Sequence, residues 1–353
     1  MPTGPHPQPS PPSGSNELQI FSMTSPGDPI FIATRGSALA LAQANMVLAQ
    51  CRAAFSGHKF ELKIIKTTGD KLQTASMAQE GSTLPKGLFT KELEVALLEK
   101  QADLAVHSLK DLPTELPAGL ELGAVGKRAD VRDVLIYRGE PTRSGGGLSM
   151  PRGFPAGLSI GQLPQGAVVA TSSTRRRAQL LAQHPGLKVP DIRGNVLTRL
   201  QKVAEKPELD ATLLALAGLT RLQYRISGEG RLEGEGLPPG LLASILAPEV
   251  MLPCVGQGAI GIEVRTGDGR VAPVCQRLND RQTFQCVTAE RAFLAAMGGG
   301  CQSPVAAYAE VVGDNLRMRA LSFAAGPLRR AEATRPISDA AQLGAQLAAQ
   351  LKG

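Results

Sequence analysis

Short apolar runs alternate with longer segments of helical period through much of the chain, and this alternation limits the possible folds more than any other feature. The runs at 30–34, 60–66 and 104–106 have the length and composition of strands. The segments at 37–55 and 90–100 place leucine and alanine on one face of a helix. Strands that alternate with helices in this way predict an α/β domain.

A second alternating unit follows, and the C-terminal part then changes character. We expect strands at 167–170, 211–216 and 260–264 and helices at 175–183 and 196–202. Glycine-rich stretches at 139–164 and 225–240 predict loops or insertions. The C-terminal part is expected to contain a helix at 289–297, a hairpin of strands at 305–312 and 316–321, and a helix at 340–351. This is the pattern of a small α+β domain, and a chain of 353 residues has room for three domains.

The cysteines and the N-terminal residues predict a reducing, non-secretory setting. The chain has 5 cysteines, an odd number, and no CxxC pair, which argues against a disulfide framework or a zinc site. Residues 1–28 are rich in proline, glycine and serine and contain no apolar run, so we expect a disordered extension and neither a secretory signal nor a transit peptide. A cytoplasmic location is therefore expected, with no transmembrane helix.

The charge balance predicts an anionic partner. The formal net charge is +7 and the pI is about 9.3. The 38 basic residues comprise 25 arginines and 13 lysines, a ratio that favours bidentate recognition of carboxylate or phosphate. Aromatic residues make up only 3% of the chain and tryptophan is absent, which argues against a platform for stacked bases.

A charged pair follows one of the expected strands. The segment 107–113 comes directly after the run at 104–106 and contains Lys110 and Asp111. Ligands of open α/β sheets bind at the carboxyl ends of strands. A cation beside a carboxylate there predicts an acid/base group whose pKa is set by its neighbours, with a solvated turn as the alternative.

Arginines recur near the junctions between expected strands and helices. The series comprises Arg35, Arg175, Arg176, Arg193, Arg199 and Arg221. Together with hydroxyls and the backbone N–H groups of helix N-termini, they predict an anion site. Phosphate and carboxylate both fit this pattern, and solvated surface arginines are the alternative. The P-loop motif GxxxxGK[ST] does not occur.

Two glycine-rich segments complete the candidate site. Three glycines precede Cys301, which favours close approach of a ligand to the thiol and fits a nucleophile, although a buried cysteine after a helix stop is the alternative. Because the 4 histidines are scattered, neither a protease dyad nor a metal centre is predicted. The glycines of the segment 255–259 predict a crossing or hinge where the chain returns between domains, with an ordinary tight turn as the alternative.

Nine segments, in this order along the chain, resemble those of the porphobilinogen deaminase (hydroxymethylbilane synthase) family. They are 33–37 (ATRGS), 67–70 (TTGD), 87–92 (GLFTKE), 107–111 (HSLKD), 171–176 (TSSTRR), 192–195 (IRGN), 255–258 (VGQG), 290–293 (ERAF) and 299–301 (GGC). No segment is decisive alone, but their ordered combination over 30–321 is highly specific.

The resemblance implies an enzyme that condenses four porphobilinogen units head to tail, releasing ammonia, into the linear tetrapyrrole hydroxymethylbilane. It also implies a dipyrromethane cofactor, made by the enzyme from its own substrate and held through a thioether to Cys301. Loss of ammonia from porphobilinogen leaves positive charge on the pyrrole nitrogen, which a carboxylate can stabilise. Asp111 stands at the position of the family's catalytic aspartate.

The matching segments also assign the remaining site residues. The implied catalytic residues are Asp111, Arg35 and Lys110. The implied cofactor-binding residues are Cys301, Ser108, Lys110, Asp111, Thr171, Ser172, Ser173, Arg175, Arg176, Arg193, Gly194, Asn195 and Gln257. The implied substrate-binding residues are Arg35, Ser37, Lys86, Arg193, Arg199 and Arg221. Each pyrrole carries an acetate and a propionate, and arginine forks are suited to bind such carboxylates.

The family fold implies three domains, of which the first two resemble periplasmic binding proteins and the third carries the cofactor loop. The expected boundaries are 29–128 with 256–279 for domain 1, 129–255 for domain 2 and 280–353 for domain 3. Thr174 stands where the family usually has leucine, and the stretches 139–164 and 225–240 are longer than usual. A monomer is expected, with neither nucleic acid nor membrane as a partner.

Two other functions fit part of the pattern. A non-enzymatic two-domain anion-binding protein would use the arginines but would need neither Asp111 nor Cys301, and such proteins usually carry an export signal. A nucleic-acid-binding protein would account for the net charge. The low aromatic content, and arginines at loop–helix junctions instead of along one helix face, count against it.

Overall fold

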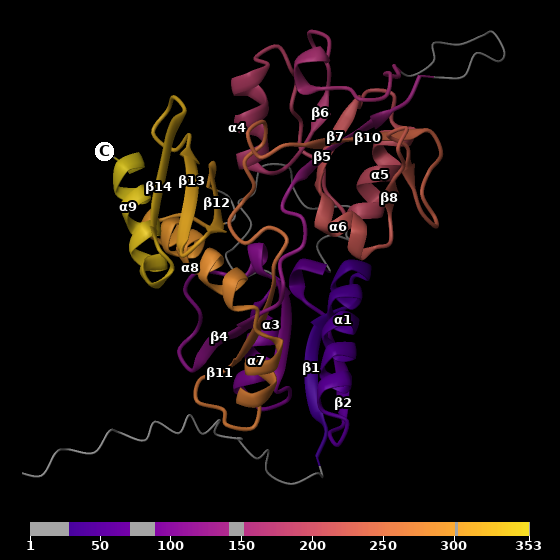
Figure 1. Cartoon of the computed structure of the whole chain (residues 1–353). Helices are drawn as coiled ribbons and strands as arrows, with labels where there is room; N and C mark the ends of the chain where they lie inside the picture. Colours follow the sequence, from indigo (N-terminus) through magenta and orange to yellow (C-terminus); the bar gives the residue numbers. More distant parts are fainter. Residues whose placement is uncertain (1–27, 71–88, 141–151, 301–302, 353) are drawn as a thin grey trace, which may run out of the picture.

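The computed structural model describes residues 28–70, 89–140, 152–300 and 303–352. In these ranges the chain builds three main sheets, each covered by its own helices (Figure 1). The extension before residue 28, part of the 139–164 stretch, Lys86 and Cys301 lie outside the described residues. The predicted fold class, α/β with a small α+β domain at the C-terminal end, is confirmed.

The first sheet has the strand order β2-β1-β3-β11-β4. Its strands are β1 (Ile30–Arg35), β2 (Phe60–Ile65), β3 (Leu104–Ser108), β4 (Leu120–Val125) and β11 (Ile260–Arg265). Helices α1 (Ala38–Ala54) and α7 (Ala272–Leu278) pack on one face, and α3 (Lys91–Leu98) packs on the other. Strand β11 returns from the second sheet and pairs antiparallel with both β3 and β4.

The second sheet has the order β10-β5-β7-β6. Its strands are β5 (Asp133–Arg138), β6 (Val169–Ala170), β7 (Ala211–Ala215) and β10 (Leu241–Leu246). Successive residues of β5 point to opposite faces, where α4 (Thr174–Gln183) covers one side and α5 (Val196–Glu205) and α6 (Leu216–Arg221) cover the other. The stretch predicted to be irregular at 225–240 contains a short two-stranded sheet of β8 (Arg225–Ile226) and β9 (Leu232–Glu233).

The third sheet is an antiparallel meander. It consists of β12 (Val305–Val312), β13 (Asn315–Ser322) and β14 (Arg329–Pro336). Helices α8 (Arg281–Ala296) and α9 (Ala340–Lys352) pack together on one face (Figure 1). Their close approach requires Gly344, because a Cβ at this position would lie 2.1 Å from the carbonyl oxygen of Ala289.

The helix predicted at 289–297 begins eight residues earlier than expected, at Arg281. Asp280 caps its N-terminus by accepting a hydrogen bond from the backbone N–H of Thr283 at 2.8 Å. The first half of α8 lies against domain 1 and its second half against β12, so it joins the third domain to the first.

The chain crosses between the first two sheets twice, and one buried carboxylate ties both crossings to the third domain. Glu290 on α8 is fully buried and accepts two hydrogen bonds from the guanidinium of Arg128, at 2.7 and 3.0 Å. It also accepts from the backbone N–H groups of Gly256 and Ala309, at 2.8 and 2.9 Å. Arg128 belongs to the first crossing and Gly256 to the second. Glu290 therefore fixes the third domain to the joint between the other two.

The described helices include none that is long and apolar enough to span a bilayer.

Candidate active site

Asp111 lies in a pocket at the carboxyl end of β3. It ends a short 3-10 helix, η1 (Leu109–Asp111), that directly follows the strand. The pocket walls include Arg35, Ser37, His107, Ser108 and Asp111. The carboxylate of Asp111 is half-buried, and it makes no hydrogen bond or ion pair with another residue of the described ranges. It is therefore available to a ligand.

Arg35 is held firmly at the edge of this pocket. Its guanidinium donates to both carboxylate oxygens of Asp70, at 2.5 and 3.2 Å, and its Cζ lies 4.2 Å from the ring centroid of Phe89. Burial of Asp70 opposes its ionisation, but hydrogen bonds from Arg35 and Thr67 outweigh this effect and lower its pKa. The ion pair and the ring together orient Arg35 beside Asp111.

A second pocket lies between the first two domains. Its walls include Ser108 and Lys110 from domain 1, Arg221 at the end of α6, and Gln257 in the second crossing. Arg221 donates to the carbonyl oxygen of Gly258 at 2.7 Å, but its buried Nε has no partner among the described residues. Burial lowers the pKa of Arg221 to about 10, as expected for a cation without a carboxylate partner. Because Ser108 lines both pockets, they are adjacent.

Three predicted site residues cap helices, and one of them, Ser37, also lines the first pocket. Ser37 accepts a hydrogen bond from the first turn of α1, Ser173 from the first turn of α4, and Asn195 from the first turn of α5. The hydroxyl of Ser172 links two of the motifs, because it donates to the carbonyl oxygen of Ile192 at 2.9 Å and accepts from the N–H of the same residue at 3.1 Å. Thr171 accepts from the N–H of Ser173 at 3.2 Å. These polar side chains therefore shape the loops that precede α4 and α5.

Arg199 lies close enough to both Arg176 and Asp111 for their charges to affect its pKa. Its Nε donates to the carbonyl oxygen of Gly194 at 2.8 Å, and Gly194 has a φ of +114°, which favours glycine. Burial, reinforced by the positive charge of Arg176, lowers the pKa of Arg199 to about 10, against an opposing effect of Asp111. The side chain of Arg193 makes no hydrogen bond with another residue of the described part of the chain.

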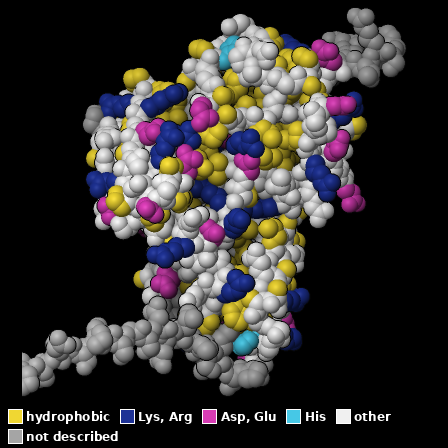
Figure 2. Space-filling model, viewed as in Figure 1, with side chains coloured by type: hydrophobic (Ala, Val, Ile, Leu, Met, Phe, Trp, Pro, Cys, Tyr) yellow, Lys and Arg dark blue, Asp and Glu magenta, His cyan; other side chains and the backbone are white. Residues whose placement is uncertain are grey.

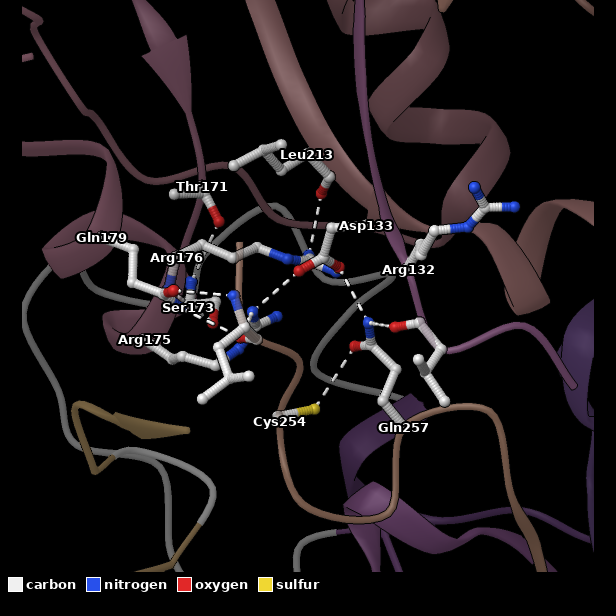
Figure 3. Close-up of polar contacts among 12 residues, drawn as sticks. Arg132, Asp133, Thr171, Ser173, Arg175, Arg176, Gln179, Leu213, Cys254 and Gln257 are labelled. Carbon is white, nitrogen blue, oxygen red and sulfur yellow. Dashed lines mark hydrogen bonds and ion pairs between the residues drawn. The ribbon is translucent and has the colours of Figure 1, made fainter. Parts of the chain in front are cut away.

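Arg175 and Arg176 are buried, with only 3% and 6% of their surfaces exposed. Both guanidiniums bind the carboxylate of Asp133, which the sequence did not single out (Figure 3). Gln257 donates to the same carboxylate at 3.0 Å. Two of the predicted arginines and the predicted glutamine therefore belong to one polar cluster at the domain joint.

A buried contact between a histidine and a carboxylate lies beneath the pocket of Asp111. Nε2 of His107 lies 2.9 Å from a carboxylate oxygen of Glu263 on β11, and both side chains are inaccessible to solvent. The sequence singled out the segment of His107 but not Glu263. The described residues contain no cluster of three or more histidine, cysteine, aspartate or glutamate side chains able to hold a metal ion.

The cysteines predict a selective labelling pattern. Burial raises the pKa of Cys51 and of Cys286 to about 11 and that of Cys275 to about 12, whereas Cys254 is only partly buried. In the native protein at neutral pH, iodoacetamide should therefore modify Cys254 and leave the other three unmodified. Peptide mass spectrometry measures the modification of each cysteine. Labelling of all four described cysteines after denaturation is the control. Rapid native labelling of Cys51, Cys275 or Cys286 would contradict the described packing.

Known families and relatives match almost the whole chain. The model for "Porphobilinogen deaminase, dipyromethane cofactor binding domain" matches residues 30–273, and "Porphobilinogen deaminase, C-terminal domain" matches 284–353. The porphobilinogen deaminase of Paracoccus denitrificans is 43% identical over 95% of this chain and 97% of its own length. Those of Lysinibacillus sphaericus and Moorella thermoacetica are 40% and 44% identical, over 90% and 80% of this chain and 92% and 79% of their own lengths. The chain belongs to the porphobilinogen deaminase family.

Proposed function

We propose that Asp111 and the arginines around the two adjacent pockets carry out the family's reaction in this chain. That reaction condenses four porphobilinogen molecules head to tail, with release of ammonia, into hydroxymethylbilane for tetrapyrrole biosynthesis. The observation that supports the proposal most is that Asp111, which makes no hydrogen bond or ion pair with another described residue, lines a pocket adjacent to that of Arg221, a half-buried arginine without a carboxylate partner among the described residues.

Asp111 acts on the reacting pyrrole. When ammonia leaves porphobilinogen, positive charge develops on the pyrrole nitrogen, and a carboxylate within hydrogen-bond reach stabilises it. The same carboxylate can take the proton that the attacking pyrrole loses. Arg35, fixed by Asp70 and Phe89, and Lys110, which immediately precedes Asp111 in the sequence, then bind the acetate and propionate groups of the substrate.

The donor set around the pockets fits the dipyrromethane cofactor. Arg175, Arg176 and Arg221 each have a buried Nε without an acceptor among the described residues, which suits them to carboxylates that the protein itself does not supply. When bound, the cofactor supplies the pyrrole position to which the first substrate unit is added. The residues proposed to hold it are Cys301, Ser108, Lys110, Asp111, Thr171, Ser172, Ser173, Arg175, Arg176, Arg193, Gly194, Asn195 and Gln257. Substrate binding is assigned to Arg35, Ser37, Lys86, Arg193, Arg199 and Arg221.

The wider assignments remain part of the proposal. The three domains are taken as 29–128 with 256–279, 129–255 and 280–353. The enzyme acts as a cytoplasmic monomer on a small molecule and binds neither nucleic acid nor membrane. On the face shown in Figure 2, basic side chains are interspersed with acidic ones, an arrangement that does not favour binding of a polyanion.

Arg221→Gln tests the proposed carboxylate site. The variant loses a guanidinium that faces the interdomain pocket, and a charge-assisted hydrogen bond of about 1.5–3 kcal/mol corresponds to an increase in KM for porphobilinogen of about 10- to 100-fold. Arg277→Gln is the control, because Arg277 is exposed on α7, away from both pockets. Steady-state kinetics measures KM, and thermal denaturation verifies folding. An unchanged KM in folded Arg221→Gln would remove Arg221 from the site.

A further inference from the structure

The carboxylate of Asp133 is the centre of the polar cluster at the domain joint. Asp133 is the first residue of β5 and is 0% exposed. Its Oδ2 accepts a hydrogen bond from Arg175 at 2.7 Å, and its Oδ1 accepts from Arg176 at 2.7 Å and from Gln257 at 3.0 Å (Figure 3). One aspartate thus orients two guanidiniums and one amide.

The partners of Asp133 are also bound to elements around it. Arg175 donates to the carbonyl oxygen of Leu252 at 2.8 Å, and Arg176 donates to that of Leu213 at 2.8 Å. Gln257 donates to the carbonyl oxygen of Val131 at 2.7 Å. Val131 precedes β5 in the first crossing, whereas Leu252 and Gln257 lie in the second. The arginine pair of α4 is therefore anchored to β7 and to both crossing segments.

The cluster retains an excess of positive charge. It contains two guanidiniums and one carboxylate, and each guanidinium keeps a buried Nε without an acceptor among the described residues. Despite complete burial, the two arginines hold the pKa of Asp133 far below its usual range, so the carboxylate stays ionised at neutral pH. Asp133 thus balances only part of the charge, and an anionic ligand can balance the rest.

We propose that Asp133 is a positioning residue, which holds Arg175 and Arg176 in the orientation that binds the carboxylates of the pyrrole chain. This inference rests on the proposed function, because it needs these arginines to face an acidic ligand. Asp133 does not touch that ligand. It occupies one terminal nitrogen of each guanidinium, prevents the two cations from turning apart, and ties their orientation to the domain joint.

Asp133→Asn tests the proposal with a nearly isosteric change. All three partners of the carboxylate are donors, so the new NH₂ group would face another N–H, and the arginines would have to move. Asp210→Asn is the matched control. Asp210 is 5% exposed, has two arginines within 4.0 Å, and precedes β7 in the same domain, at the opposite end of that strand from Asp133.

Three measurements on purified, folded protein separate positioning from general stability. They are the melting temperature, the fraction of chains that carries a two-pyrrole mass adduct under denaturing mass spectrometry, and KM and kcat for porphobilinogen. Both variants should have a lower melting temperature than the unsubstituted protein. Only Asp133→Asn should lower the adduct-bearing fraction or raise KM, by about tenfold or more for the loss of oriented charged hydrogen bonds.

Asp133→Glu supplies a second test if the asparagine variant does not fold. Glutamate keeps the charge but displaces the carboxylate by one methylene, so positioning predicts a raised KM or a lowered adduct fraction, whereas charge balance alone predicts neither. The inference is overturned if folded Asp133→Asn has the same KM and the same adduct-bearing fraction as Asp210→Asn. It is also overturned if Asp133→Glu has the same KM and the same adduct-bearing fraction as the unsubstituted protein. Failure of the proposed function itself is distinguishable, because the unsubstituted protein would then show neither adduct nor turnover.

Discussion

Asp111→Asn is expected to lower kcat for hydroxymethylbilane formation by about 100-fold or more, the usual effect of losing a charged group that acts in the transition state. Asparagine keeps the size of the side chain, but it neither carries a negative charge nor accepts a proton. Because Asp111 makes no ion pair or hydrogen bond with another described residue, folding should change little. Ammonia release from porphobilinogen measures the first effect, and thermal denaturation measures the second.

Glu61→Gln is the control for Asp111→Asn. Glu61 lies on β2 of the same sheet, and among the described residues its only ion pair is with the exposed Lys59. Its replacement by glutamine removes one negative charge, as Asp111→Asn does. This variant should retain normal turnover, since a surface ion pair contributes little to stability and Glu61 lines neither pocket. Turnover of Asp111→Asn equal to that of Glu61→Gln would remove Asp111 from the reaction.

The sequence predicted the elements whose pattern is local. The first two strands and α1 follow from an apolar run and a helical period, and the structure places them at β1, β2 and α1. Strands β5 and β10 were not predicted, because they are short apolar runs whose pairing depends on residues about 100 positions apart. Strand β14 was missed for a different reason: it is a polar edge strand that pairs with β13 over its whole length.

The sequence predicted the site residues that lie within the recognised motifs, but not those that lie between them in the chain. Asp111 and Arg35 line the same pocket, as the motifs suggested, and Lys110 and Arg221 line the next. Asp133 was missed because its partners lie over 40 residues away and become neighbours only when β5 pairs with β7.

Glu290 shows the same limit. It belongs to one of the matching segments, but no local pattern connects it to Arg128, which is 162 positions away. An acidic residue at the start of the apolar run 134–137 is the signal that could have identified Asp133, since such a group is rarely buried without a cationic partner.

Cys301→Ser is expected to abolish product formation. Cys301 lies outside the described residues, and its proposed role rests on the resemblance of segment 299–301 to the family's GGC segment. A serine hydroxyl is far less nucleophilic than a thiolate at neutral pH, so it should not form the covalent link to the cofactor. Without that link the first substrate unit has no anchored pyrrole to join. Cys254→Ser is the matched control and should retain both cofactor and activity, and turnover of porphobilinogen measures the difference.

The mass of the intact, denatured protein distinguishes a covalently anchored two-pyrrole cofactor from an unmodified chain. We expect the purified chain to be heavier than its sequence by two pyrrole units, and we expect this added mass to be absent from Cys301→Ser but present in Cys254→Ser. The adduct-bearing protein should also convert porphobilinogen to hydroxymethylbilane. A chain that has only the mass of its sequence and nevertheless turns over porphobilinogen at a normal rate would exclude a reaction primed by a cofactor on Cys301.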